Sequence, residues 1–307
     1  MSIPGAGLAE FMARRGRTIV EAAGTYWHGV PGRMLMSLPY HLTPDPDAEA
    51  VADMLRQTRA SGVRYPSLKR AGLSSGLYVC RDASYDFPSV RPRQRTKVRG
   101  GLRRCEIRPL EAKELLTQGL QLNLDTMRRQ GRWDPEFGEP RPWMRLVEAV
   151  RLASEVRAMG ALVDGRLAAY NILYRADGWT HLLHQMSRTD LLDHYPNHAL
   201  SFFVTREALQ APDAIGMSYG LASLVSGEGL HSYKLELGYE FVPRNAVIQL
   251  HPALGPVFGS VPARVLVQGL RRLRPQDQRL EYVDAVVRGS APRGSAVARP
   301  AASLEVA

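Results

Sequence analysis

The chain has 307 residues, of which 45% are apolar, so it can bury a substantial core as one large domain or as two smaller ones. No run of about 18 apolar residues is present to cross a bilayer, and residues 1–17 lack the apolar core of a signal peptide, so we expect a cytoplasmic protein without membrane insertion. The net charge of +10 favours an anionic partner, and nucleic acid, a phosphorylated cofactor and a membrane surface all meet that requirement.

Cysteine usage excludes a disulfide framework. The two cysteines, Cys80 and Cys105, have no metal-ligand spacing to each other or to a histidine. We therefore predict a reduced compartment, packing roles for both thiols and no bound metal.

The first hundred residues predict a peripheral helix followed by a small β-α-β unit. Residues 1–32 place Leu8, Phe11 and Met12 at helical spacing, which indicates an amphipathic helix with a glycine-rich approach. Residues 33–100 predict a β-α-β unit and a basic segment. The elements of the unit are a strand at Arg33–Leu42, a helix at Asp45–Gly62 and a strand at Gly76–Cys80.

The basic segment Arg91–Arg104 contains six arginines and one lysine that no apolar face explains. Two interpretations stay open for it. The first is a solvated surface segment or helix. The second is an element that faces phosphate, because guanidinium groups match phosphate oxygens in pairs. For the second interpretation, the candidate anion-binding residues are Arg95, Arg99 and Arg103.

Residues 101–257 predict an orderly series of strands and helices. It begins with a strand at Glu106–Leu110, a helix at Glu111–Gln130 and, after a proline-rich break at 135–142, a helix at Trp143–Val156. Three strands follow at Arg157–Val163, Leu167–Tyr174 and Trp179–Ser187, joined by Asp-Gly dipeptides typical of turns between antiparallel strands. The series ends with a helix at Pro196–Leu209, a strand at Ile215–Tyr219, a helix at Gly227–Leu237 and a strand at Tyr239–Leu250.

The most informative segment is Tyr233–Pro243, in which a helix is stopped by glycine and followed at once by an aromatic-led strand. Gly238 fits the left-handed position that ends a helix. Tyr239 and Phe241 suit a strand.

This helix-glycine-aromatic-strand pattern resembles the signature of GNAT and FemAB-like acyltransferases. The order β-α-α-β-β-β-α-β-α-β over residues 104–250 is also that of a GNAT domain. The resemblance implies an α/β (α+β) GNAT acyl-CoA N-acyltransferase fold with a mixed central sheet, and it suggests that residues 33–100 are a reduced second GNAT-like half. Residues 258–287 predict a C-terminal helical extension, and residues 288–307 a disordered tail.

In the GNAT fold two central parallel strands separate, and the acyl arm of the donor lies in the gap with its carbonyl held by backbone amides. The resemblance puts the walls of that gap at Thr180–Ser187 and Ile215–Leu221. His184 is either satisfied within the sheet or a base that takes the proton of an attacking amine. The polar candidates there are His184 and Tyr219 for catalysis and Gln185 and Ser187 for donor binding.

The turn before the third helix departs from the family pattern. GNAT enzymes that use coenzyme A hold its pyrophosphate in a glycine-rich turn, whereas residues 187–199 contain no glycine. The departure counts against an ordinary acetyl-CoA mode and fits the FemAB-like branch, in which a proline, here Pro196, often opens this helix. Tyr195, Asn197 and His198 either line the donor site or cap the helix.

Lys234 lies four residues before Gly238, where FemAB-like relatives place a lysine and many GNAT enzymes a tyrosine. An ammonium near the gap can neutralise the oxyanion that grows on a carbonyl, or grip a donor phosphate. The alternative is a surface lysine near a helix C-terminus, which the helix dipole favours.

The resemblance therefore implies an N-acyltransferase in which a small-molecule amine attacks an activated acyl group directly. Acyl-CoA or acetyl-CoA is the expected co-substrate, and charged tRNA is the alternative donor, with the basic segment along its backbone. A binding protein with the same fold, gripping nucleic acid or an anionic ligand without catalysis, is the other class. The sequence leaves the acceptor amine and the oligomeric state open.

Overall fold

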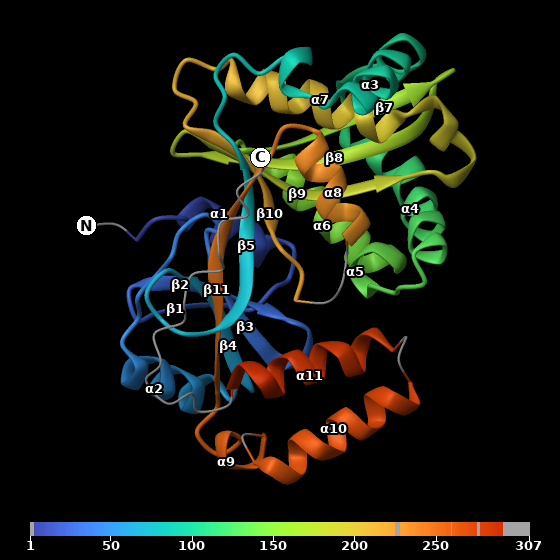
Figure 1. Cartoon of the computed structure of the whole chain (residues 1–307). Helices are drawn as coiled ribbons and strands as arrows, with labels where there is room; N and C mark the ends of the chain where they lie inside the picture. Colours follow the sequence, from blue (N-terminus) through green and yellow to red (C-terminus); the bar gives the residue numbers. More distant parts are fainter. Residues whose placement is uncertain (1–2, 225–227, 259, 275–276, 291–307) are drawn as a thin grey trace, which may run out of the picture.

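The computed structural model describes residues 3–224, 228–258, 260–274 and 277–290. Within them, eleven strands form one mixed sheet in the order β1-β2-β3-β4-β11-β5-β10-β9-β8-β7-β6, which runs through the whole molecule (Figure 1). This confirms the predicted α/β class with a mixed central sheet.

The N-terminal part supplies half of the sheet and the basic helix. Its elements are α1 (Ala6–Arg14), β1 (Ile19–Ala22), β2 (Thr25–Val30), η1 (Pro31–Arg33), β3 (Met34–Leu38), α2 (Ala48–Thr58), β4 (Gly62–Ser67), β5 (Leu73–Cys80), η2 (Phe87–Ser89) and α3 (Pro92–Arg104).

Three of these strands were not predicted. Strands β1 and β2 form a short hairpin closed by Ala23 and Gly24, both with positive φ, in a segment predicted as a glycine-rich approach. Strand β4 contains Pro66, which normally counts against a strand because it lacks an N–H. It forms because β11 and β3 pair with its two edges.

The C-terminal part follows the predicted order closely. Its elements are β6 (Glu106–Pro109), α4 (Ala112–Arg129), α5 (Pro135–Gly138), α6 (Pro140–Leu152), β7 (Val156–Val163), β8 (Arg166–Ala176), β9 (Trp179–Ser187), η3 (Thr189–His194), α7 (Pro196–Leu209), β10 (Gly216–Leu221), α8 (Glu228–Glu236) and β11 (Glu240–Leu250). Positive φ at Asp164-Gly165 and Asp177-Gly178 confirms the two predicted turns of the β7–β8–β9 meander.

Strand β5 joins the two parts into one sheet. It comes from the N-terminal part but lies between β10 and β11, pairing antiparallel with both. The chain thus inserts a strand from its first third into the middle of its last third. The division of the chain near residue 100 stays a prediction.

Strands β9 and β10 separate where the resemblance predicts. They pair in parallel over three residues only, ending at Ser218 opposite His181. Beyond that point β9 stays paired with β8, with an irregularity between Leu182 and His184. Strand β10 is also irregular after Ser218 and pairs with β5 again at Leu221. An irregularity of this kind bends a strand, which helps to carry β9 away from β10.

The end of α8 confirms the role predicted for Gly238. Its φ is 89°, its N–H donates to the carbonyl of Leu235, and the N–H of Tyr239 donates to the carbonyl of Lys234. These two bonds are those of a Schellman motif. The motif turns the chain directly into β11 and fixes Lys234 one turn before that strand.

Three helices follow β11 in the described part of the C-terminal region. They are α9 (Gly255–Phe258), α10 (Val261–Leu273) and α11 (Gln278–Ser290). Residues 288–290 end α11 and are helical, contrary to the predicted disorder, and residues 291–307 lie outside the described residues. None of the described helices has both the length and the apolar character needed to span a bilayer.

Replacing Gly238 by alanine tests the helix end. A Cβ at this position would lie 2.7 Å from the carbonyl oxygen of Ser89, in a left-handed conformation. We expect Gly238→Ala to lower the free energy of unfolding by about 2 kcal/mol, measured by urea denaturation. Gly269→Ala, inside α10 with open space around it, is the control and should change stability by less than about 1 kcal/mol. Equal effects of the two variants would contradict this account of the helix end.

Candidate functional site

A cavity of about 1110 Å³ opens where β9 and β10 separate. Its walls come from β9, β10, α7 and α8, together with the end of α4 and the N-terminal strands β3 and β4. The polar and charged side chains in its lining are those of Tyr40, Arg64, Thr126, Arg129, Gln130, Arg132, His184, Gln185, Ser187, Asn197, His198, Tyr219, Ser223, Tyr233 and Lys234. Both parts of the chain therefore build this site.

Lys234 is buried at the cavity wall with 5% of its surface exposed. Its Nζ donates to the carbonyl oxygen of Tyr219 at 3.2 Å and lies 4.0 Å and 4.8 Å from the ring centroids of Tyr78 and Tyr219. Burial lowers its pKa to about 8. The lysine is thus held by aromatic faces and one carbonyl, which leaves a mostly cationic amine at pH 7.

A polar network connects four elements around the cavity. The Gln185 amide donates to Asn197 Oδ1 at 3.3 Å and to Ser201 Oγ at 3.0 Å, and the Tyr219 hydroxyl donates to Gln185 Oε1. Tyr233 donates to Ser201 Oγ at 3.3 Å. Four predicted residues, Tyr219, Gln185, Ser187 and Asn197, are brought together here, since Asn197 also donates to Ser187 Oγ at 2.9 Å.

His184 lines the cavity, and the buried guanidinium of Arg15 forms a hydrogen bond with its ring. Nη2 of Arg15 lies 2.8 Å from His184 Nε2, and because a guanidinium only donates, this nitrogen is the acceptor. Burial, together with the charges of Arg15 and Arg17, keeps the pKa of His184 well below its usual value. The predicted base role gains no support from this geometry, since the Nε2 lone pair is already engaged.

Arg15 belongs to a buried ion-pair network. Glu136 on α5 accepts from Arg15 Nε at 2.7 Å and Nη2 at 2.6 Å, and from Arg17 Nη2 at 2.5 Å. Burial raises the pKa of Glu136, but the hydrogen bonds and charges of both arginines outweigh it and hold the pKa below its usual value. One carboxylate faces two guanidinium groups, so the network carries a net positive charge beside His184.

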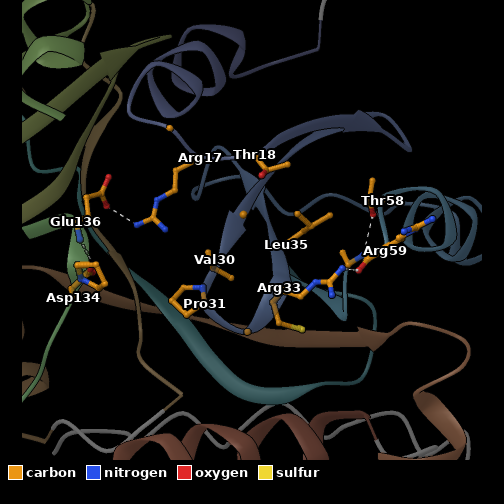
Figure 2. Close-up of a pocket in the computed structure, with 16 residues that line it drawn as sticks. Arg17, Thr18, Val30, Pro31, Arg33, Leu35, Thr58, Arg59, Asp134 and Glu136 are labelled. Carbon is orange, nitrogen blue, oxygen red and sulfur yellow. Dashed lines mark hydrogen bonds and ion pairs between the residues drawn. The ribbon is translucent and has the colours of Figure 1, made fainter. Parts of the chain in front are cut away.

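A second, smaller cavity of about 590 Å³ lies on the N-terminal side of this network (Figure 2). Figure 2 shows Arg17 reaching from that cavity towards Glu136, while Arg33 and Arg59 lie together at the other end. The ion pair of Arg17 with Glu136 therefore forms part of the lining of the small cavity, and Arg15 connects the same carboxylate to the main one.

The two remaining residues predicted to bind the acyl donor, His198 and Tyr195, lie in different environments. His198 lines the main cavity and lies edge-on to Tyr233, with ring centroids 5.2 Å apart. Burial lowers its pKa to about 4. Tyr195 is not part of the lining; it precedes α7 in a left-handed conformation, and its ring lies against Gly100 of α3.

Helix α3 packs against the first turn of α7. Gly100 and Gly101 permit the approach, because a Cβ on Gly101 would lie 2.6 Å from the carbonyl oxygen of Tyr195. Arg95 donates to the carbonyls of Val90 and Pro88, at 2.6 and 2.9 Å. Of the other two predicted anion-binding residues, Arg99 lies over the ring of Phe87 and Arg103 is exposed. The basic helix thus packs on the start of α7, which lines the cavity, while Arg95 and Arg99 contact the loop that precedes α3.

Sequence reasoning missed several residues of the site. Tyr78 and Arg64 come from N-terminal strands that the sequence gives no reason to place beside α8. Arg129 lies in the predicted helix at Glu111–Gln130 and was not among the predicted site residues. Its side chain donates to the carbonyl of Ser187 at 3.1 Å. Residues 72–76 also match the Gly-x-Ser-x-Gly pattern of hydrolase nucleophiles, but the central Ser74 lies within β5, opposite Asn245, and not on a strand-to-helix turn.

The described lining of the main cavity is cationic. It includes Arg64, Arg129, Arg132 and Lys234 and no aspartate or glutamate. Within the described part of the chain, no three side chains of His, Cys, Asp or Glu are placed to share a metal ion. The arrangement suits a ligand that carries negative charge.

The sequence matches no family model and has no significant match among curated proteins. The fold, however, is that of several solved structures. FemX aligns with a TM-score of 0.56 and 12% identity, covering 88% of this chain and 94% of FemX. L-PGS from Bacillus licheniformis aligns with a TM-score of 0.52 and 12% identity, covering 80% of this chain and 88% of that one. The C-terminal domain of a putative lysylphosphatidylglycerol synthetase from Agrobacterium fabrum gives 0.51 and 13%, covering 78% and 87%.

These likenesses confirm the GNAT/FemAB-like fold expected from the sequence. At 12–13% identity they establish the arrangement of the chain alone. The chemistry depends on the residues that line the cavity.

Glu136→Gln tests the buried network. Removing the carboxylate leaves two guanidinium groups without their partner, and we expect a loss of about 3 kcal/mol in unfolding free energy at pH 7. Because the pKa of Glu136 is lowered on folding, its contribution is complete above the unfolded value of about 4.3 and is lost as pH falls through the folded value. The difference between wild type and variant should therefore shrink in acid. Glu10→Gln removes an exposed pair with Arg14 and should change nothing measurable; a similarly small effect at Glu136 would contradict the prediction.

Proposed function

We propose that this protein is an N-acyltransferase that passes an acyl group from an activated donor directly to an amine. The observation that carries the proposal is the separation of β9 and β10 beside the buried Lys234, in a cavity whose described lining contains no carboxylate. This geometry offers a slot for a donor and a cation where charge develops during acyl transfer.

The chemistry follows from what the slot provides. The acceptor nitrogen attacks the donor carbonyl, and the oxyanion that forms faces Lys234 Nζ and the backbone amides of β9 that have no partner on β10. The bond from carbon to the leaving sulfur or oxygen then breaks, and the leaving atom takes a proton from the Lys234 ammonium. The nitrogen that formed the amide releases its own proton, which restores the ammonium.

The lining also restricts the substrates. Because no carboxylate base is among the described residues of the lining, the acceptor amine enters in its neutral form. Arg64, Arg129 and Arg132 favour substrates with phosphate or carboxylate groups. An acyl-CoA, with its phosphates at the arginines and its thioester at Lys234, meets these requirements and is the first candidate donor.

A second donor, aminoacyl-tRNA, is favoured by one observation. Helix α3 packs on the start of α7, which lines the cavity, and the side chains of Arg93 and Arg103 on α3 are exposed. A polyanion whose activated end enters the slot would meet this helix next.

Lys234 variants test the catalytic assignment. Lys234→Met should lower kcat/KM about 100-fold, because it removes a cation from the developing oxyanion, while donor binding persists. In the wild type the rate should fall as pH rises through about 8, since the amine loses its charge there. Lys234→Arg should move that alkaline limit upward. The measurement is thiol release from acetyl-CoA with a panel of amines across a pH range.

Lys113→Met, on an exposed face of α4, is the matched control. A Lys234→Met enzyme within a few-fold of wild type would remove the lysine from the mechanism. Lost donor binding in that variant would favour the non-catalytic binding protein instead.

Donor screening tests which activated acyl group is used. Coenzyme A, longer acyl thioesters and charged tRNA are each added to the protein, and the true donor should raise its melting temperature. If the donor is tRNA, Arg93→Gln with Arg103→Gln should reduce the slope of log affinity against log salt by about two. The double variant Lys113→Gln with Arg141→Gln removes the same charge elsewhere and should leave the slope unchanged. Stabilisation by coenzyme A with no effect of the α3 variant would select the thioester, and stabilisation by none of the ligands would count against the proposal.

A further inference from the structure

Helix α10 forms the outermost layer of the C-terminal end of the molecule. Helix α11 packs on β11 and β5, and α10 packs on the far side of α11 (Figure 1). The inner face of α10 is fixed by buried Val267 and by Arg271, whose Nη1 lies 3.3 Å from Asp284 Oδ2 on α11. These contacts determine which face of the helix is left to solvent.

The outer face of α10 is apolar. Val265, Leu266 and Leu273 are 63%, 63% and 79% exposed. At 100° per residue these three side chains fall within an arc of about 100°, on the side that the anchoring residue Val267 does not occupy. Val257 on the neighbouring helix α9 is exposed as well. A contiguous apolar stripe of this kind normally marks a surface that meets a partner.

The charge along the same helix is of one sign. Residues 261–274 contain four arginines and no aspartate or glutamate. Arg271 is neutralised by Asp284, while Arg272 and Arg274 are exposed. Arg272 borders the apolar stripe, and Arg274 follows the last helical residue. An apolar stripe with arginine beside it is the composition of helices that lie in the plane of a membrane surface.

We propose that α10 docks flat on an anionic lipid bilayer, with Val265, Leu266 and Leu273 below the headgroups and Arg272 and Arg274 among the lipid phosphates. Charge complementarity favours this occupant, because the helix offers no acidic group to repel anionic lipid. A second copy of the chain fits less well. A helix of 13 residues is about 20 Å long, and a single stripe along it falls short of the roughly 800 Å² per partner that a stable dimer buries. Docking of this kind is peripheral and needs no membrane-spanning segment.

Vesicle co-sedimentation of the full chain tests the proposal. The vesicles contain either phosphatidylcholine alone or equal amounts of phosphatidylcholine and phosphatidylglycerol. The wild type should sediment with the mixed vesicles at low salt and much less with phosphatidylcholine alone. Leu266→Glu with Leu273→Glu should weaken binding to the mixed vesicles at least tenfold, because it places charge in the stripe. Arg272→Gln with Arg274→Gln should weaken it roughly tenfold or more and flatten its dependence on salt.

The control is Leu68→Glu with Met144→Glu, which adds the same charge at exposed apolar residues away from α10 and should bind as the wild type does. Melting temperatures establish that every variant is folded. Absence of wild-type binding to the mixed vesicles, or unchanged binding by the α10 leucine variant, would overturn the proposal. So would a wild-type dimer in solution that the same leucine variant converts to monomers, because a second copy would then cover the stripe.

Discussion

The site depends on strand β5 holding β10 in place while β9 leaves it. A strand that loses its neighbour on one edge keeps its position only if the other edge stays paired, because unpaired backbone groups away from water are costly. Here β10 pairs with β5 up to Ser218 and, after an irregularity, again at Leu221, although its pairing with β9 ends at Ser218. The N-terminal part of the chain is therefore a structural requirement for the cavity as well as part of its lining.

The same arrangement explains the state of Lys234. Strand β5 brings the ring of Tyr78 to one side of the amine, β10 brings Tyr219 to another, and the Schellman motif at Gly238 fixes the helix that carries the lysine. Burial of an ammonium is costly, no described side chain of the cavity lining offers Lys234 a carboxylate, and burial lowers the pKa of the amine. An anionic ligand or a developing oxyanion in the cavity would supply negative charge beside Lys234. The free-energy cost of burying this ammonium therefore points to a functional role.

Local patterns made much of the C-terminal part predictable. Strand β9 and helix α7 have the predicted bounds, because the Asp177-Gly178 turn and Pro196 mark their starts. Gly238 predicted the helix end, since only a residue tolerant of positive φ fits there. The separation of β9 and β10 was predicted from the family resemblance. Nothing in the sequence of either strand alone indicates that the two strands part.

What could not be predicted depends on contacts between distant parts of the chain. Strand β4 forms despite Pro66 because two neighbouring strands pair with it, and β5 enters the site by crossing into the C-terminal half of the sheet. The pairing of Arg15 with Glu136 spans 121 residues and has no local signature, yet Arg15 also engages His184, one of the candidate bases of the sequence. Periodicity identifies the elements, while packing between them decides which polar side chains are available for chemistry.

The most direct test of the central claim is competitive chemical labelling of the lysines across pH, followed by mass spectrometry, with and without a bound donor analogue. We expect Lys234 to gain reactivity with a midpoint near pH 8, and the analogue to protect Lys234 while the exposed Lys69 and Lys113 keep their labelling. A Lys234 that shows no midpoint near pH 8, and that the analogue leaves unprotected, would contradict a buried amine that faces the ligand in this cavity.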